Sequence, residues 1–262
     1  MVSVEPAMDR GFSTAPPQAA RPSHRHLLNR LAGAQKSSKG APAYSRYVNR
    51  RAGRHLAAVA YRLGLTPNTV TAVSALFSLA GIVVLATIRP SLLSGVAVAG
   101  SLVVGYALDS ADGQLARLRG GGSPSGEWLD HMIDAAKISS LHLAVLIATF
   151  RFLDVPSGWL LVPLGFTIVA AVTFFGMTLN DQLRRAAPMP RLSTSTSALR
   201  SLAVIPTDYG LLCLLFVLLG VPAAFFIGYS LLFAANLVFL VLASVKWFGE
   251  MKRLKPRPDR TI

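Results

Sequence analysis

Charged residues are scarce in this chain. Only 15% of its 262 residues are charged and 52% are hydrophobic, whereas about a quarter of the residues in a typical soluble domain are charged. This balance argues against a water-soluble globular protein and favours a chain surrounded largely by lipid. Cysteine is scarcer still, because Cys213 is the only one. A disulfide framework within the chain and a cysteine-cluster metal site are therefore excluded.

Acidic residues are also few. The chain has 12 of them against 26 lysines and arginines, which gives a formal net charge of +14 at pH 7. Such an excess suits either nucleic acid or an anionic membrane surface. The positions of the basic residues along the chain must distinguish the two.

Six apolar stretches are long enough to be membrane-spanning helices, which need about 20 residues. Thr66 and Pro67 form a typical N-cap and first-turn pair before the first stretch. Pro206 and Asp208 interrupt the fifth, and no alternation typical of strands is present. We therefore predict an all-α, polytopic membrane protein with six transmembrane helices. The stretches are 69–88, 91–108, 128–150, 158–179, 201–220 and 222–247.

A shorter amphipathic helix is predicted before the first span, over residues 44–64. Val48, Leu56 and Val59 fall on one stripe of this helix, while arginines such as Arg50 and Arg54 form another. This pattern is typical of a cytoplasmic helix that lies in the headgroup plane and binds anionic lipid. A solvated basic helix is the alternative. The predicted domains are a disordered basic cytoplasmic tail (1–43), this juxtamembrane helix, a six-helix membrane domain (65–250) and a basic cytoplasmic tail (251–262).

The basic residues are unevenly distributed between the two sides of the predicted bundle. They cluster before the first span, after spans two and four, and after span six, whereas only Arg89 and Arg151 fall in loops on the other side. By the positive-inside rule, both termini and the loops after spans two and four are cytoplasmic. Topology and anionic lipid thus explain the positive charge, and no nucleic-acid partner is expected.

The informative acidic residues lie between 109 and 134. Asp109 and Asp112 are three residues apart and share one helical face, and Asp130 and Asp134 share a face of the next helix. The glycine-rich segment 119–126 between them can only be a turn. The chain therefore reverses, and the two acidic faces are expected to meet at the cytoplasmic ends of spans two and three.

Four convergent carboxylates are unstable at membrane depth unless cations lie among them. Oxygen ligands without histidine or cysteine favour Mg²⁺ or Mn²⁺, and four carboxylates suffice for two ions about 4 Å apart. The alternative is a purely structural set of ion pairs with Arg117, Arg119 and Lys137.

The same residues form a recognisable motif. Asp109-Ser-Ala-Asp112-Gly113-Gln-Leu-Ala116-Arg117, followed after eight residues by Gly126-Glu-Trp-Leu-Asp130-His-Met-Ile-Asp134, resembles the signature D-x2-D-G-x2-A-R-x8-G-x3-D-x3-D of the CDP-alcohol phosphotransferases (also called CDP-alcohol phosphatidyltransferases) at every fixed position. Residues 67–71 are similar to the segment that opens the first span in this family. The resemblance covers about residues 44–247.

The resemblance implies a reaction and a set of roles. Family members take a CDP-linked alcohol, commonly CDP-diacylglycerol, transfer its phosphoryl-alcohol half to an acceptor alcohol and release CMP. By this resemblance Asp109, Asp112 and Asp130 are metal ligands, and Asp134 is both a ligand and the general base. A homodimer is implied as well. The residues expected at the nucleotide and diphosphate are Asp109, Asp112, Gly113, Ala116, Arg117, Gly126, Pro67, Asn68 and Thr71; Arg117 equally fits a structural ion pair.

The acceptor is inferred from the remaining basic residues. Lys137 lies inside a span, which calls for a specific reason, and Arg184, Arg185, Arg191 and Arg200 lie in the loop after span four. These residues could bind a phosphorylated acceptor, although the loop arginines equally fit charges set by topology. Family members that use phosphorylated polyols place basic residues near the acceptor, so the resemblance implies a phosphorylated polyol such as inositol phosphate or glycerol phosphate. Amino alcohols remain an open alternative. The alternative functions are a prenyltransferase-like membrane enzyme and a non-catalytic cation-binding membrane protein. A prenyltransferase would need a second, distant acidic cluster, and a transporter would need paired repeats.

Overall fold

The computed structural model describes residues 22–33, 42–186 and 207–254, and this part of the chain is built from helices and turns with no strand. The all-α prediction is therefore confirmed. The elements are α1 (His24–Gly33), η1 (Ser45–Asn49), α2 (Arg50–Arg62), α3 (Pro67–Thr87), α4 (Leu92–Leu118), α5 (Pro124–Phe152), η2 (Ser157–Leu160), α6 (Leu161–Ala186), α8 (Tyr209–Leu215), η4 (Phe216–Gly220) and α9 (Pro222–Met251).

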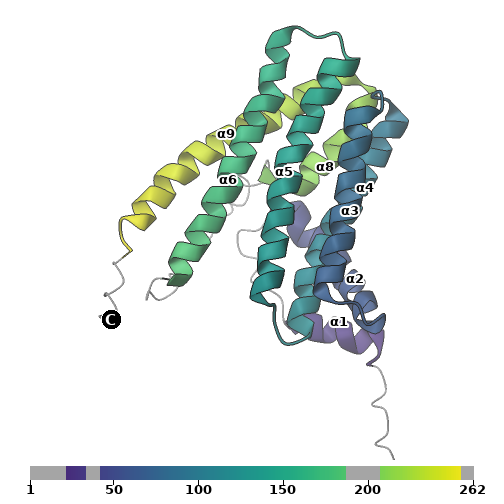
Figure 1. The fold of residues 1–262 in the computed structure, drawn as a ribbon, viewed down its shortest axis with the longest axis vertical. Helices are drawn as coiled ribbons and strands as arrows, with labels where there is room; N and C mark the ends of the chain where they lie inside the picture. The colour runs from purple at the N-terminus through teal and green to yellow at the C-terminus, as the bar shows by residue number, and fades with distance from the viewer. Residues whose placement is uncertain (1–21, 34–41, 187–206, 255–262) are drawn as a thin grey trace, which may run out of the picture.

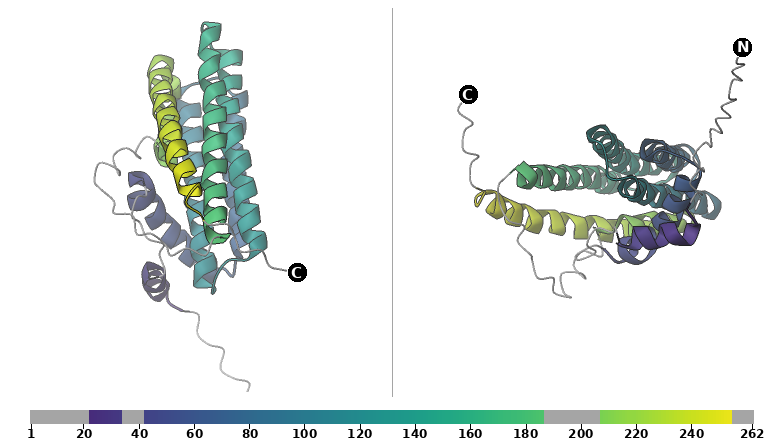
Figure 2. Two further views of the ribbon diagram at one scale, coloured as in Figure 1. Left: turned by 90° about the vertical axis from the view of Figure 1, so that its left-hand side faces the viewer. Right: turned by 90° about the horizontal axis from the view of Figure 1, so that it is seen from below.

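The long helices form an elongated bundle. α3, α4 and α5 run side by side, and α6 and α9 extend the bundle to one side (Figure 1). The short helices α1 and α2 lie at the end of the bundle where α4 ends and α5 begins, and the second pair of views agrees (Figure 2). The sequence segment that carries the acidic motif is thus at the same end as the N-terminal helices.

The described residues contain five helices that are long and apolar enough to cross a membrane: Pro67–Thr87, Leu92–Leu118, Pro124–Phe152, Ser157–Ala186 and Pro222–Met251. The predicted fifth span, 201–220, is not among them. Its described part is the short apolar helix Tyr209–Gly220, which is shorter than the roughly 20 residues that a spanning helix needs. Residues 201–206 lie outside the described part. Six spans are therefore not confirmed, and Asp208 caps the start of this short helix by accepting a hydrogen bond from the Gly210 amide at 3.1 Å.

The N-terminal region differs from the prediction in one respect. The sequence predicts a disordered tail over residues 1–43, yet His24–Gly33 form α1, and its Leu27 and Leu31 are buried against α2 and α4. Two leucines four residues apart make a narrow apolar stripe that a search for continuous apolar runs overlooks. Residues 1–21 and 34–41 of this segment lie outside the described part of the chain.

The predicted amphipathic helix over 44–64 corresponds to the π-helical turn η1 followed by α2. α2 packs on α4 through a face of small residues, Gly53, Ala57 and Ala60. The larger apolar side chains Val59 and Leu63 stay exposed, at 46% and 68%. The helix therefore has one face bound to the bundle and an apolar edge left outside it.

Local sequence explains the turn that joins α4 to α5. The amide of Gly121 donates to the carbonyl of Ala116 at 2.9 Å, which closes the end of α4. Gly120 and Gly121 have φ of 100° and 132°, a region that side chains with a Cβ rarely adopt. Ser123 then caps α5 by accepting from the Gly126 amide at 3.0 Å, with Pro124 in the first turn. The predicted reversal of the chain is confirmed.

α3 and α4 approach each other through small residues. The Ser74 hydroxyl donates to the carbonyl of Gly105 at 2.8 Å, and a Cβ on Gly105 would clash with the Ser78 hydroxyl. Such close contacts are how helices associate in lipid, where apolar side chains gain little by leaving the bilayer. Large apolar side chains elsewhere on the helices face outward, for example Leu93 at 81% exposed. The bundle is that of an all-α membrane protein.

A side chain at Gly105 should push α3 and α4 apart. Gly105→Leu is expected to lower the thermal unfolding temperature of the purified chain, because overpacking a tight contact costs about 1 to 3 kcal/mol. Gly100→Leu is the matched control on the same helix, since Gly100 is exposed and a Cβ added there would meet no atom within 4 Å. Equal unfolding temperatures for the two variants would contradict the close α3–α4 contact.

Candidate active site

Two helices place the four predicted aspartates at one end of the bundle. α4 carries Asp109 and Asp112, and α5 carries Asp130 and Asp134 after the turn. One carboxylate oxygen from each of Asp109, Asp130 and Asp134 lies within 4.8 Å of the others. These three residues are partly buried. The structure therefore brings together three of the four aspartates that the sequence predicted as a metal-binding set.

Asp112 occupies a different position. Its side chain is buried, at 6% exposed, and accepts a hydrogen bond from the Thr71 hydroxyl at 2.6 Å. Thr71 was predicted to contact the nucleotide, and in the structure its hydroxyl binds this carboxylate. Asp112 is outside the group of three but shares two pockets with Asp130. It thus borders the group of three and is anchored to α3.

Lys137 lies among the carboxylates. Its ammonium group is 2.6 Å from Oδ1 of Asp134 and 3.2 Å from Oδ1 of Asp109, and its side chain is only 6% exposed. The sequence predicted this lysine as an acceptor contact. In the structure it forms ion pairs with the two aspartates and neutralises part of their charge, as a buried group of like charges requires.

The donor set fits a hard divalent cation. Every group within the 4.8 Å cluster is a carboxylate oxygen, which is the ligand type that Mg²⁺ and Mn²⁺ prefer. Three carboxylates against one ammonium leave an excess of negative charge at a partly buried site. The residues present are therefore compatible with metal binding.

A pocket of about 700 Å³ lies beside the aspartates, between the starts of α3 and α5 and the end of α4. It contains all the residues predicted at the nucleotide and diphosphate except Asp109. The structure thus unites two sequence segments that are about 40 residues apart. The predicted residues on its wall are Pro67, Asn68, Thr71, Asp112, Gly113, Ala116, Arg117 and Gly126.

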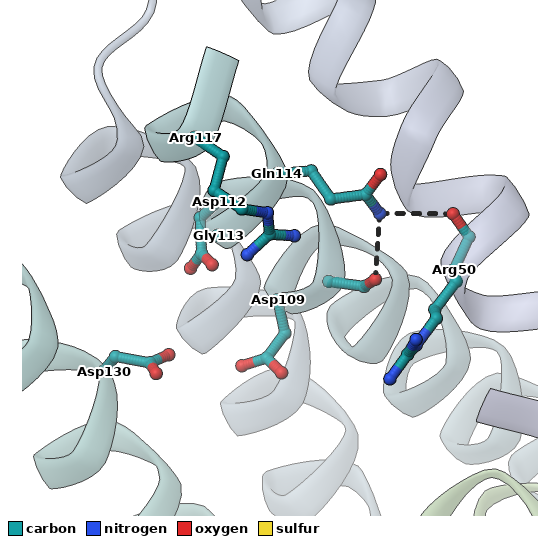
Figure 3. A pocket seen from close by; sticks show the side chains of 8 residues that line it. Arg50, Asp109, Asp112, Gly113, Gln114, Arg117 and Asp130 are labelled. Carbon is teal, nitrogen blue, oxygen red and sulfur yellow. Dashed lines mark hydrogen bonds between the residues drawn. The ribbon is translucent and has the colours of Figure 1, made fainter. Parts of the chain in front are cut away.

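A second pocket of about 190 Å³ adjoins the first (Figure 3). The two share Asp112, Gly113, Arg117 and Asp130. The smaller pocket adds Asp109, Ser110 and Gln114 from α4 and Arg50 from α2. The two pockets are therefore adjacent, and together they extend from the residues predicted at the nucleotide to the juxtamembrane helix α2.

The arginines predicted for the acceptor separate into three groups. Arg185 lines the larger pocket and pairs with Glu127 of α5. Arg184 pairs with Glu250 of α9, so the structure does not bring it to the aspartates. Arg191 and Arg200 lie outside the described residues. Of the loop arginines that the structure describes, only Arg185 borders the site.

The sequence interpretation missed several residues of the two pockets. Arg50, Ser110 and Gln114 line the smaller one, and Arg119, Glu127 and His131 line the larger one. Arg50 belonged to a predicted cationic stripe, but helical periodicity alone does not indicate which arginine faces the bundle. Ser110 and Gln114 lie inside the acidic motif at its variable positions, so their spacing to the aspartates was a usable signal.

Comparison with known proteins agrees with the motif. A family model described as CDP-alcohol phosphatidyltransferase matches residues 64–246. No curated protein matches the chain. Crystal structures of Mycobacterium tuberculosis phosphatidylinositol phosphate synthase (PgsA1) are similar at 21% identity and a TM-score of 0.51. The structure with CDP-DAG bound covers 82% of this chain and 98% of that chain, and the complex with manganese and citrate covers 79% and 92%. At this identity the likeness establishes a common fold.

The position of Lys137 predicts competition with metal. Lys137→Met should tighten Mn²⁺ binding by roughly 10-fold, because a unit charge about 3 to 4 Å from a ligand contributes on the order of 1 kcal/mol even in water-like surroundings. Lys246→Met is the matched control, since Lys246 pairs with Glu250 on α9 instead. The measurement is a Mn²⁺ titration of the purified protein. Unchanged or weaker Mn²⁺ binding by Lys137→Met would show that the ammonium does not compete.

Proposed function

Because the chain belongs to the CDP-alcohol phosphatidyltransferase family, we propose that it transfers the phosphoryl-alcohol group of a CDP-linked alcohol to an acceptor alcohol and releases CMP. Membership makes the protein an integral membrane transferase of phosphate-containing groups. CDP-diacylglycerol is the proposed donor, supported by the similar synthase whose structure holds CDP-DAG. One observation carries the proposal: Asp130, one of the three convergent carboxylates, lines a pocket that also contains the residues of α3, α4 and α5 predicted at the nucleotide.

The proposed metal ligands are Asp109, Asp112, Asp130 and Asp134, holding Mg²⁺ or Mn²⁺, with two ions as the proposed number. The all-oxygen donor set supports this assignment, and a similar synthase was crystallised with manganese. Bound there, divalent cations would neutralise the charge of the diphosphate and of the leaving CMP. The hydrogen bond from the Thr71 hydroxyl fixes the Asp112 carboxylate in the position from which it would bind metal.

The proposed chemistry at the protein's own groups is a proton transfer coupled to displacement at phosphorus. The acceptor oxygen forms a bond to the phosphorus of the alcohol phosphate, the bond from that phosphorus to CMP breaks, and Asp134 takes the hydroxyl proton. Asp134 suits this role because it lies one helical turn beyond Asp130 in the same group of carboxylates. Gly113, Ala116 and Arg117 form the wall against which the donor is oriented.

The proposed acceptor is a phosphorylated polyol such as inositol phosphate or glycerol phosphate. The proposal is supported by two cations near the aspartates: Lys137 pairs with Asp134, and Arg185 lines the larger pocket. Both side chains suit a phosphate. Arg184 is not assigned to the acceptor, since it pairs with Glu250 on α9. Arg191 and Arg200 are still proposed as acceptor-binding residues, on the sequence alone.

The proposed orientation places the active site and both termini in the cytoplasm. The distribution of basic residues supports it through the positive-inside rule. α2 would then lie in the interface, with exposed Val59 and Leu63 in contact with acyl chains and exposed Arg51 near anionic headgroups. A homodimer is proposed on family resemblance.

CMP release tests the proposed function. The purified full chain should release CMP from CDP-diacylglycerol when given Mn²⁺ or Mg²⁺ and a panel of alcohols that includes inositol phosphate, glycerol 3-phosphate and amino alcohols. EDTA should abolish this release, and added metal should restore it. CMP is quantified by chromatography. Full activity in EDTA would contradict the metal proposal, and absence of CMP with every alcohol would contradict the reaction.

Asp134 should be distinguishable from a simple ligand. Asp134→Asn is expected to lower turnover by roughly 10²- to 10⁴-fold, the usual worth of a general base. Its Mn²⁺ and CDP affinities should change by only about a few-fold, because the other three proposed ligands remain. Asp130→Asn should weaken Mn²⁺ binding and turnover together. Turnover and Mn²⁺ titrations of both variants provide the comparison. If excess metal restores the turnover of Asp134→Asn, this residue acts as a ligand alone and the base lies elsewhere.

A further inference from the structure

Arg50 brings a positive charge from the juxtamembrane helix into the site. It is the first residue of α2 and lines the smaller pocket together with Asp109, Asp112 and Asp130 (Figure 3). Arg117 lines the same pocket from α4. No residue of the signature motif lies on α2, so the motif does not account for this contribution.

Direct contacts hold the start of α2 against the motif helix. The side-chain amide of Gln114 donates to the Arg50 carbonyl at 3.1 Å and to the Ser110 hydroxyl at 3.3 Å. At Gly53, one turn along α2, a Cβ would lie 2.7 Å from the Ser110 hydroxyl and 2.9 Å from Nε2 of Gln114. The backbone of Arg50 is therefore anchored to the segment of α4 that carries Asp109 and Asp112.

Arg50 and Arg117 bring two guanidinium groups to the lining of one pocket. The oxygens of a phosphate group suit them, because they accept the paired, parallel hydrogen bonds that a guanidinium offers. The carboxylates of the same pocket are the proposed metal ligands, so the arginines are where phosphate oxygens would bind.

The smaller pocket adjoins the part of the site proposed for the nucleotide and diphosphate. Arg50 lines only the smaller pocket, together with Asp109, Asp112, Gly113 and Arg117, which belong to the proposed nucleotide and diphosphate set. A group bound at Arg50 therefore lies next to the aspartates and the diphosphate residues.

We propose that Arg50 binds phosphate oxygens of a substrate in the smaller pocket, so that the juxtamembrane helix is part of the active site. The phosphate belongs either to the diphosphate of the donor or to a phosphorylated acceptor. The identity of these substrates rests on the proposed function, whereas phosphate binding by Arg50 rests on the pocket. Arg50 is thus a substrate-binding residue supplied from outside the motif.

Two binding titrations test this proposal on the purified full chain with Mn²⁺, one with CDP and one with inorganic phosphate. Arg50→Gln should weaken at least one of them by roughly 10- to 100-fold, the usual worth of hydrogen bonds to a charged group. Weaker CDP binding assigns Arg50 to the donor diphosphate. Weaker phosphate binding with CDP unchanged assigns it to the acceptor phosphate.

Arg51→Gln is the matched control, because it removes the same charge from the next, exposed position of α2. Its affinity for both probes should equal that of the wild type. Gly53→Ala changes no charge but must displace α2, and it should weaken the same titration as Arg50→Gln. If Arg50→Gln does not fold, Arg50→Lys replaces it and should weaken that titration less, since the paired geometry alone is lost.

Three results would overturn the proposal: Arg50→Gln binding both probes like the wild type, Arg51→Gln matching its loss, or a wild-type chain that binds neither probe. These results are separable from failure of the proposed function. A wild type that releases no CMP but loses phosphate or CDP binding on Arg50→Gln would contradict the transferase reaction alone and leave the phosphate site in place.

Discussion

Repulsion among carboxylates is the constraint on which this structure depends. The turn between α4 and α5 forces Asp109, Asp130 and Asp134 to within 4.8 Å of one another at the end of a lipid-embedded bundle. Such an arrangement is unfavourable unless positive charge joins it. The chain supplies one such charge itself, the ammonium of Lys137, at 2.6 Å and 3.2 Å from two of the aspartates. The remaining excess of negative charge is compatible with the binding of divalent cations.

The surrounding helices hold this unfavourable arrangement in place. α3 contributes the Thr71 hydroxyl to Asp112 and packs closely on Gly105. α2 packs on the opposite side of α4 through Gly53 and the hydrogen bond between Gln114 and the Arg50 carbonyl. Because α4, which carries the first half of the motif, packs against α3 on one side and α2 on the other, it cannot easily rotate to move its carboxylates away from those of α5. The two pockets follow from the same packing, since they lie where α2, α3 and α5 meet α4.

Local patterns predicted the centre of the site but not its surroundings. Helical spacing and an unavoidable glycine turn were enough to predict that the aspartates converge, because both are properties of the segment 109–134 itself. The bond from Thr71 to Asp112, the inward direction of Lys137 and the approach of Arg50 depend on how separate helices pack, and periodicity carries no such information. Six spans are not confirmed, because Asp208 caps a short helix that begins inside the predicted fifth span.

We propose that the converging carboxylates hold two divalent cations side by side. Electron paramagnetic resonance of the purified chain during a Mn²⁺ titration tests it directly, since two ions about 4 Å apart are magnetically coupled. The account predicts two Mn²⁺ per chain with a coupled spectrum, and loss of the coupled signal in Asp130→Asn. A single uncoupled Mn²⁺, or binding that Asp130→Asn leaves unchanged, would contradict it.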